Sequence, residues 1–210
     1  MFKDRVDAGT QLAERLRDYA GAADTIVLGI PRGGVVVAAR VARELRLPLD
    51  IVSAAKVGAP GNSEFAVGAV APDGEVTVNQ SSGMSSAQVT AAAGPARNKI
   101  AHQLALFRGD SPDPELAGRT AIVVDDGIAT GLTAISAVRY LRRRGAKVVL
   151  AAPVASREAV VALEPEADAL IVVDVPAFFG AVGQFYSAFG QTTDAEVLAL
   201  LGEARARSGT

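Results

Sequence analysis

Short apolar runs alternate with helical patterns along this chain of 210 residues. Each run is continuous and contains few polar residues, which is typical of strands that are buried on both faces. Helices between consecutive strands favour parallel pairing. The sequence therefore predicts an α/β fold, in which a Rossmann-like parallel sheet is flanked by helices. The expected strands are residues 25–30, 50–55, 119–124, 147–153 and 168–174.

Glycine and proline residues divide the rest of the chain. Pro72-Asp73-Gly74 separates two apolar runs and predicts a β-hairpin over residues 65–79. Residues 57–62 are rich in Gly and Pro and predict a mobile loop. Pro95 should kink or break a long Ala-rich helix, and Asp194 is expected to cap the last helix. The expected helices are residues 4–20, 33–45, 85–108, 132–144, 157–163 and 194–207.

Composition excludes several classes of function. The chain has 21 Lys and Arg against 23 Asp and Glu, so no basic surplus points to a nucleic-acid partner. Cysteine is absent, which excludes thiol nucleophiles and thiolate metal sites. His102 is the single histidine, which rules out a multi-histidine metal site, and we expect it to lie on the surface or in packing.

Residues 175–193 carry no charged side chain and are long enough to raise the question of a membrane span. Pro, Gly and Gln interrupt this segment, which argues against a spanning helix. Residues 1–5 do not have the pattern of a signal peptide. We therefore expect a soluble, cytoplasmic protein with no membrane partner.

Residues 121–133 have the clearest chemical signature. An apolar run ends at Asp125 and Asp126, a small hydroxyl-rich turn follows, and a helical pattern begins at Leu132. The free N–H groups of such a turn and the positive end of the helix dipole suit a phosphate. Two aspartates would repel that phosphate, so they require sugar hydroxyls, a cation or both. The combination indicates a ribose 5-phosphate site, and the alternative is a turn that only caps the strand.

The sequence D-D-G-I-A-T-G-L-T at 125–133 resembles the signature of type I phosphoribosyltransferases, which bind 5-phosphoribosyl pyrophosphate (PRPP). The resemblance implies that Asp125 and Asp126 hold the ribose 2- and 3-hydroxyls and favour positive charge near C1. It also implies a cradle for the 5-phosphate. The residues of this cradle would be Ala129, Thr130, Gly131, Leu132 and Thr133, and Gly127 would join them in binding the ribose 5-phosphate part of PRPP.

The sequence G-I-P-R-G-G at 29–34 contains three glycines and a proline, which imply an unusual backbone close to a partner. A tight strand-to-helix turn is the alternative. Beside the PRPP signature, this segment resembles the pyrophosphate loop of the family, which often carries a strained or cis peptide bond. The residues implied in pyrophosphate binding are Ile30, Pro31, Arg32, Gly33 and Gly34, with Lys56 from the next strand, and Arg32 and Lys56 would act in catalysis.

Lys56 is expected to end the second strand. The carboxyl ends of parallel strands meet at one edge of a sheet, so Gly29, Lys56 and Asp125 should converge. The family often carries a basic dipeptide here, but Ala55 precedes Lys56, so one positive charge is missing. We expect Lys56 to neutralise the departing pyrophosphate, and the alternative is a solvated lysine. Glu64 is either an acid/base group acting on the acceptor or a surface glutamate.

The acceptor site is predicted from aromatic residues that follow the last expected strand. In the family, a small hood in this region holds the acceptor base. Phe178 and Phe179, or Phe185 and Tyr186, would stack on a planar ring, although packing in the core is the alternative for each. Ala129 stands where the enzymes for hypoxanthine and guanine carry an aspartate, which disfavours a 6-oxopurine acceptor.

With G-I-P-R-G-G and K-V-G-A-P-G-N, this stretch resembles a bacterial branch of the family whose acceptor the sequence does not identify. The resemblance covers nearly the whole chain. It implies one domain over residues 1–210, with a core at about 24–174 and a hood at about 175–193 joined by the terminal helices.

The function implied is transfer of the 5-phosphoribosyl group from PRPP to a nucleobase-like nitrogen in nucleotide salvage, with release of pyrophosphate. Mg²⁺ would be bound through PRPP and water, with no direct protein ligand. A homodimer is a further implication of the resemblance. The alternatives are a non-catalytic, PRPP-binding regulatory protein and an enzyme that acts on another phosphorylated sugar.

Overall fold

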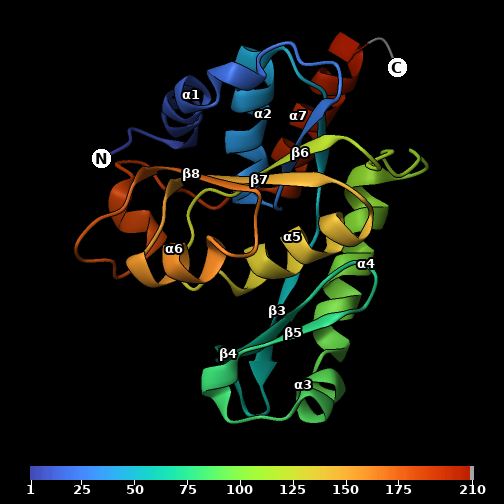
Figure 1. Cartoon of the computed structure of the whole chain (residues 1–210), viewed down its shortest axis with the longest axis vertical. Helices are drawn as coiled ribbons and strands as arrows, with labels where there is room; N and C mark the ends of the chain where they lie inside the picture. Colours follow the sequence, from blue (N-terminus) through green and yellow to red (C-terminus); the bar gives the residue numbers. More distant parts are fainter. Residues whose placement is uncertain (209–210) are drawn as a thin grey trace.

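The computed structural model describes residues 1–208, except for the side chains of Glu64 and Ser208. Five strands form a parallel sheet in the order β2-β1-β6-β7-β8 (Figure 1). Strand order changes direction between β1 and β6, which is where ligands bind in sheets of this kind. The predicted α/β fold is confirmed. The strands are β1 (Thr25–Gly29), β2 (Leu49–Ile51), β6 (Thr120–Val124), β7 (Lys147–Val154) and β8 (Ala169–Asp174).

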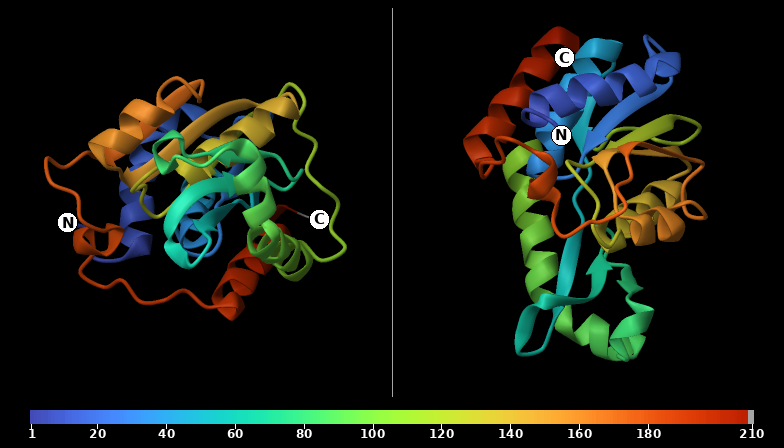
Figure 2. Two further views of the ribbon diagram at one scale, coloured as in Figure 1. Left: turned by 90° about the horizontal axis from the view of Figure 1, so that it is seen from below. Right: turned by 90° about the vertical axis from the view of Figure 1, so that its left-hand side faces the viewer.

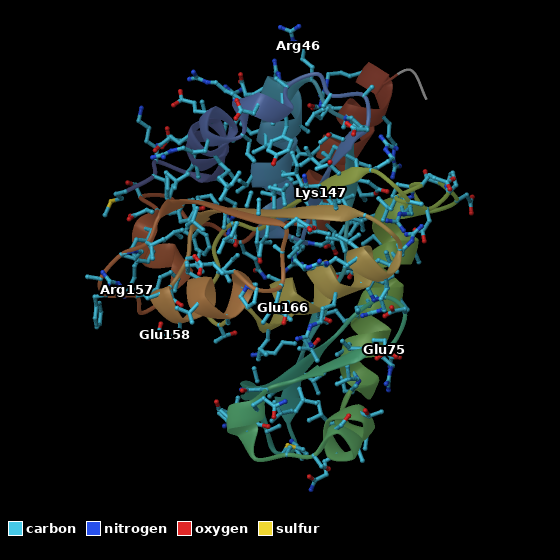
Figure 3. The ribbon with its side chains drawn as sticks, in the orientation of Figure 1. Arg46, Glu75, Lys147, Arg157, Glu158 and Glu166 are labelled. Carbon is cyan, nitrogen blue, oxygen red and sulfur yellow. The ribbon has the colours of Figure 1, made fainter. Side chains whose placement is uncertain are left out.

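Helices cover both faces of this sheet (Figures 1 and 2). Successive residues of a strand point to opposite faces. Ile122 therefore packs with the helices α1, α2 and α7, while its neighbour Val123 packs with α5 and α6. Side chains fill the space on both sides of the sheet (Figure 3). The helices are α1 (Arg5–Arg15), α2 (Gly33–Leu45), α5 (Leu132–Arg143), α6 (Arg157–Leu163) and α7 (Asp194–Ser208).

A smaller lobe is inserted between β2 and β6 (Figure 2). Its three strands are antiparallel in the order β3-β4-β5, and two helices pack on them around a separate core that includes Val57, Val67 and Ile100. The hairpin predicted over residues 65–79 is confirmed within this lobe. Its elements are β3 (Ala55–Ala59), β4 (Asn62–Val70), β5 (Val76–Val78), α3 (Ser86–Ala92) and α4 (Gly94–Arg108).

The strand predicted at residues 50–55 is wrong in its extent. β2 ends at Ile51, the chain leaves the parallel sheet, and Lys56 lies within β3 of the smaller lobe. Most of residues 50–55 are apolar because residues on either side of the exit are buried in different cores. The loop predicted at 57–62 is also wrong as an element, because these residues form the β3–β4 hairpin, with Gly61 in the turn at φ 79°.

The break predicted near Pro95 is confirmed, since α3 ends at Ala92 and α4 begins at Gly94 with the proline in its first turn. Ile100 of α4 is buried in the core of the smaller lobe, whereas Phe107 of the same helix is buried in the main core. One continuous helix therefore joins the two lobes.

The cap predicted for the last helix is wrong by one residue. Asp194 is the first residue of α7, and the preceding Thr193 pairs with Glu196 instead. The Thr193 N–H donates to Glu196 Oε2 at 2.7 Å, and the Glu196 N–H donates to Thr193 Oγ1 at 3.2 Å. This reciprocal capping box leaves the Asp194 carboxylate available to face the loop after β1.

Residues 175–193, which lack charge, run mostly without regular structure. In the described chain they contain one turn of 3₁₀ helix, η3 (Val182–Phe185). Among the described residues, no helix has both the length and the apolar character that a membrane span requires.

Ser156 joins α6 to the turn that precedes α5, and we predict that Ser156→Ala destabilises the fold. The hydroxyl donates to the Ala129 carbonyl at 2.7 Å and accepts the Ala159 N–H at 3.0 Å. Loss of this cap and of the buried hydrogen bond should cost about 1–2 kcal/mol, a fall in Tm of roughly 2–8 °C by calorimetry. Ser111→Ala, at an exposed position, is the control; equal Tm values for the two variants would contradict the structural role of Ser156.

Candidate functional site

Two of the predicted motifs meet at the carboxyl edge of the sheet. Gly29 pairs with Val124 in the parallel register of β1 and β6, and the Ile30 N–H donates to the Val124 carbonyl at 2.9 Å. The loop after β1 therefore runs directly beside Asp125 and Asp126. Lys56, which was predicted at the same edge, lies in the smaller lobe instead, because its strand belongs to the other sheet.

Glycines allow the first turn of α2 to lie against the acidic pair. A Cβ atom at Gly33 would be 2.0 Å from Asp126 Oδ2, and one at Gly34 would be 2.7 Å from the Val124 carbonyl oxygen. Neither position has room for a side chain. The peptide bond between Pro31 and Arg32 is cis, as the family resemblance implied.

The two aspartates form an electrostatically unfavourable pair. Burial, together with the adjacent Asp126 carboxylate, raises the pKa of Asp125 well above its usual value of 3.8. Burial also raises the pKa of Asp126, although a hydrogen bond from Arg5 opposes the shift. Asp125 Oδ1 accepts the Asp126 N–H at 2.9 Å, which fixes its orientation. Arg5 contacts Asp126 and not Asp125, so the Asp125 carboxylate has no ion-pair partner among the described residues and can accept hydrogen bonds from a ligand.

Arg5 is a site residue that sequence analysis missed. Its Nε donates to Asp126 Oδ2 at 2.7 Å, and its Nη1 donates to the Gly190 carbonyl at 2.8 Å. The guanidinium carbon also lies 3.9 Å from the centroid of the Phe189 ring. No local pattern marks Arg5, since 121 positions separate it from Asp126 and only the packing of α1 brings them together.

The predicted acceptor residues do not come together at this edge. Phe178 is 82% exposed, and Phe179 packs against Phe185 with ring centroids 5.1 Å apart. Tyr186 packs between Phe2 and Phe189, and its hydroxyl donates to the Asp126 carbonyl. Burial raises the pKa of that hydroxyl, so it remains a donor at physiological pH. The side chain of Glu64 lies outside the described part of the structure.

The turn predicted to hold a 5-phosphate leads into α5. Gly131 has φ 78° and is the N-terminal cap residue of that helix, while Ala129 and Thr130 are exposed before it. The first N–H groups of a helix lack partners within the helix and attract anions. Leu163 packs beneath Gly131 and supports the turn from below, so that a Cβ atom at Gly131 would be 3.3 Å from Leu163 Cγ.

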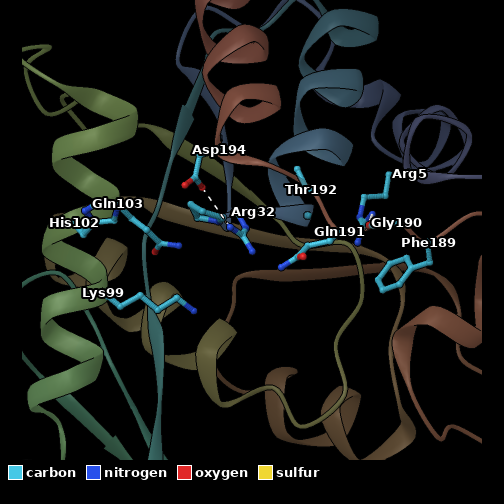
Figure 4. A pocket seen from close by; sticks show the side chains of 12 residues that line it. Arg5, Arg32, Lys99, His102, Gln103, Phe189, Gly190, Gln191, Thr192 and Asp194 are labelled. Atoms are coloured by element: carbon cyan, nitrogen blue, oxygen red, sulfur yellow. Dashed lines mark hydrogen bonds and ion pairs between the residues drawn. The ribbon is translucent and has the colours of Figure 1, made fainter.

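A cavity of about 690 Å³ opens beside the loop after β1 (Figure 4). Arg32 lies inside it, and Arg32 Nη1 is 3.4 Å from Asp194 Oδ1. Lys56 does not line this cavity; it lines a second one of about 570 Å³ in the smaller lobe. The residues of the first cavity are Arg5, Pro31, Arg32, Gly33, Lys99, His102, Gln103, Phe189, Gly190, Gln191, Thr192 and Asp194.

Sequence analysis did not assign the α4 residues of this cavity to the site. His102 is exposed, as expected, but it also faces the cavity beside Lys99. Gln191 and Thr192 line the cavity from the segment before α7. Among the described residues, no group of three or more His, Cys, Asp and Glu side chains is placed to hold a metal ion on its own.

Comparisons with known proteins agree with this geometry. A family model described as "Phosphoribosyl transferase domain" matches residues 2–188. Two Mycobacterium tuberculosis proteins, from strains CDC 1551 / Oshkosh and H37Rv and provisionally named phosphoribosyl transferases, are each 42% identical over 209 residues. The matches cover 97% of this chain and 47% of each relative, so the chain spans about half the length of these curated relatives.

A solved structure extends the comparison to the fold. The crystal structure of the protein TT1426 from Thermus thermophilus is 41% identical to this chain and has a TM-score of 0.79. The match covers 96% of this chain and 98% of that one. The matched region of the two structures therefore includes the smaller lobe as well as the main sheet.

We predict that Asp125→Asn raises the Tm of the ligand-free protein. Because the pKa of Asp125 is raised on folding, the folded state binds more protons than the unfolded chain above pH 3.8, and stability falls as pH rises from there to the folded pKa. The amide removes this penalty while its oxygen can still accept the Asp126 N–H. Calorimetry should show a gain that grows as pH rises above the usual pKa of 3.8 and that vanishes below it. A gain that is equal at all pH values would contradict the electrostatic cause.

Proposed function

The chain belongs to the phosphoribosyl transferase family, and from this premise we propose that it transfers the 5-phosphoribosyl group of PRPP to a nitrogenous acceptor and releases pyrophosphate. One observation carries the proposal. The acidic pair lies between the loop of residues 29–34 and the turn at 129–133, so groups suited to pyrophosphate, ribose and phosphate follow one another along one sheet edge. PRPP presents the same three groups in the same order.

In this proposal each part of PRPP has its own partner. Asp125 and Asp126 accept hydrogen bonds from the ribose hydroxyls, which relieves their mutual repulsion. The N–H groups and hydroxyls of residues 129–133 surround the 5-phosphate. The loop at 30–34 and Arg32 bind the pyrophosphate. The contact between Arg5 and Asp126 would weaken as the ribose binds.

The reaction requires position and charge stabilisation and no covalent nucleophile. The bond from ribose C1 to the pyrophosphate oxygen breaks, and its electron pair leaves with pyrophosphate. The acceptor nitrogen donates its lone pair to C1, and the proton that it carried passes to solvent. Positive charge that develops near C1 is favoured by the two carboxylates, and the buried site strengthens this effect.

Mg²⁺ is the cation that we propose to accompany PRPP. Arg5 pairs with Asp126 alone, so Asp125 has no ion-pair partner among the described residues, and oxygen donors suit this hard ion. Asp125 and Asp126 would hold it through water and the oxygens of PRPP. When bound, the ion would neutralise part of the charge on the pyrophosphate.

We propose a planar, nucleobase-like ring as the acceptor. Phe189 supports this choice, since it is 38% exposed, lines the cavity and already contacts the Arg5 guanidinium. It replaces Phe178 and Phe179 as the candidate for stacking, because neither of those rings lines the cavity. Ala129 still disfavours a 6-oxopurine.

Pyrophosphate release from PRPP and Mg²⁺ tests the proposed function across a panel of acceptors: adenine, uracil, orotate, nicotinate, hypoxanthine and guanine. We expect release with one acceptor, and none with the two 6-oxopurines. PRPP binding without release for any of them would contradict transfer and favour a regulatory PRPP-binding protein. Release of phosphate from another sugar phosphate, without PRPP turnover, would favour the other alternative.

The matched variants are Asp125→Asn with Asp126→Asn, and the exposed pair Asp18→Asn with Asp110→Asn as control. The first pair loses two charged acceptors of the ribose hydroxyls, so PRPP affinity should fall at least about 100-fold, with near-native circular dichroism. The control should bind PRPP as the wild type does. Equal PRPP affinity in both double variants would contradict the site.

A further inference from the structure

Resting on the proposed function, we infer that α4 forms the second wall of the pyrophosphate pocket. In this inference Lys99 is the basic residue that contacts the leaving group. Gln103 donates a hydrogen bond to it, and Ser53 holds Gln103 in position. None of these three residues belongs to the sequence motifs of the site.

The cavity of about 690 Å³ lies on the pyrophosphate side of the sheet edge. Pro31, Arg32 and Gly33 form one wall, and Lys99 and Gln103 are on the opposite wall (Figure 4). None of the residues at 129–133 lines this cavity. A ligand that enters it therefore meets the loop after β1 and α4 together, away from the turn that suits the 5-phosphate.

Charge in the cavity favours a highly charged anion. Asp194 is the one acidic residue among those that line it, and that carboxylate lies 3.4 Å from Arg32. Arg5 is occupied by Asp126 at 2.7 Å. The Lys99 side chain is exposed and has no ion pair or hydrogen bond within the part of the chain that the structure describes. Its positive charge is thus left for a ligand.

Lys99 takes the place that the sequence led us to expect for Lys56. Where the family often carries a basic dipeptide, this chain has the single lysine Lys56. That lysine lies in the smaller lobe. Lys99 lines both the first cavity and the second one, in which Lys56 lies. Helix α4, which joins the lobes, therefore places the positive charge of Lys99 in the cavity that Arg32 lines. Strand β3 does not place Lys56 there.

Gln103 is a buried amide whose orientation is fixed. It is 7% exposed, and the fully buried Ser53 hydroxyl donates to its Oε1 at 2.7 Å. With its oxygen engaged in this way, the NH₂ group is the part that remains for the cavity, and the side chain points into it from α4 (Figure 4). The spacing of positions 99 and 103 puts the two donors on one face of the helix.

These two donors would act as the bond to C1 breaks. Negative charge then builds on the pyrophosphate oxygens, so a hydrogen bond from an ammonium group becomes stronger. The neutral amide of Gln103 adds a directional hydrogen bond without a further positive charge. Ser53 is a positioning residue, since it acts only through Gln103.

Calorimetric titration with two probes tests the role of Lys99. The probes are Mg²⁺-pyrophosphate and ribose 5-phosphate, which lacks the leaving group. Lys99→Met should weaken pyrophosphate binding about tenfold or more, because a charge-assisted contact is lost, and should leave ribose 5-phosphate affinity within about twofold. Lys147→Met is the matched control, because Lys147 begins β7 at the opposite edge of the sheet (Figure 3).

Several outcomes would overturn this assignment. Unchanged pyrophosphate affinity in Lys99→Met, or equal weakening of both probes, would show that Lys99 does not contact the leaving group. A loss in Lys56→Met that Lys99→Met lacks would return the role to Lys56. Failure of the wild type to bind either PRPP or ribose 5-phosphate would instead contradict the proposed function itself.

A double-mutant cycle tests the positioning role of Ser53. Gln103→Leu should weaken pyrophosphate binding about fivefold. Ser53→Ala should weaken it by less, and should add nothing in the Gln103→Leu background, since it acts through that amide. Ribose 5-phosphate affinity should stay within about twofold in all three variants. Additive losses of pyrophosphate affinity would contradict the coupling.

Discussion

Parallel pairing between β1 and β6 is the constraint on which the site depends. The register that sets Gly29 opposite Val124 brings the loop after one strand against the carboxylates after the other. Helix α2 can then begin beside the acidic pair, because Gly33 and Gly34 leave room for it. A shift of one residue in this register would separate the groups that we assign to pyrophosphate and ribose.

This arrangement places destabilising charge where a ligand is proposed to bind. Burial raises the pKa of both aspartates, and the Asp126 carboxylate raises that of Asp125 further, while Arg5 and Tyr186 hold the pair in place through contacts with Asp126. These contacts come from α1 and from the segment after β8, which are far apart in the sequence. Both segments are thus part of the site, and the cost of the pair is partly offset before any ligand arrives.

Sequence patterns predicted those features of the fold that depend on residues close together in the chain. The strands β1 and β6, the loops that follow them and the break at Pro95 could be read from the sequence, since each depends on neighbours. The position of Lys56 could not be predicted, because residues 50–55 are mostly apolar on both sides of the point where the chain leaves one sheet for the other. Arg5, Lys99 and Phe189 do not belong to a site motif in the sequence, and only tertiary packing brings them to the cavity.

Titration of the purified protein with PRPP in the presence of Mg²⁺ tests the central claim most directly. The account predicts one PRPP bound per chain, with ribose 5-phosphate and pyrophosphate each binding more weakly at the same site and each competing with PRPP. Absence of PRPP binding would contradict the account, since the acidic pair, the turn before α5 and the loop after β1 would then serve another ligand.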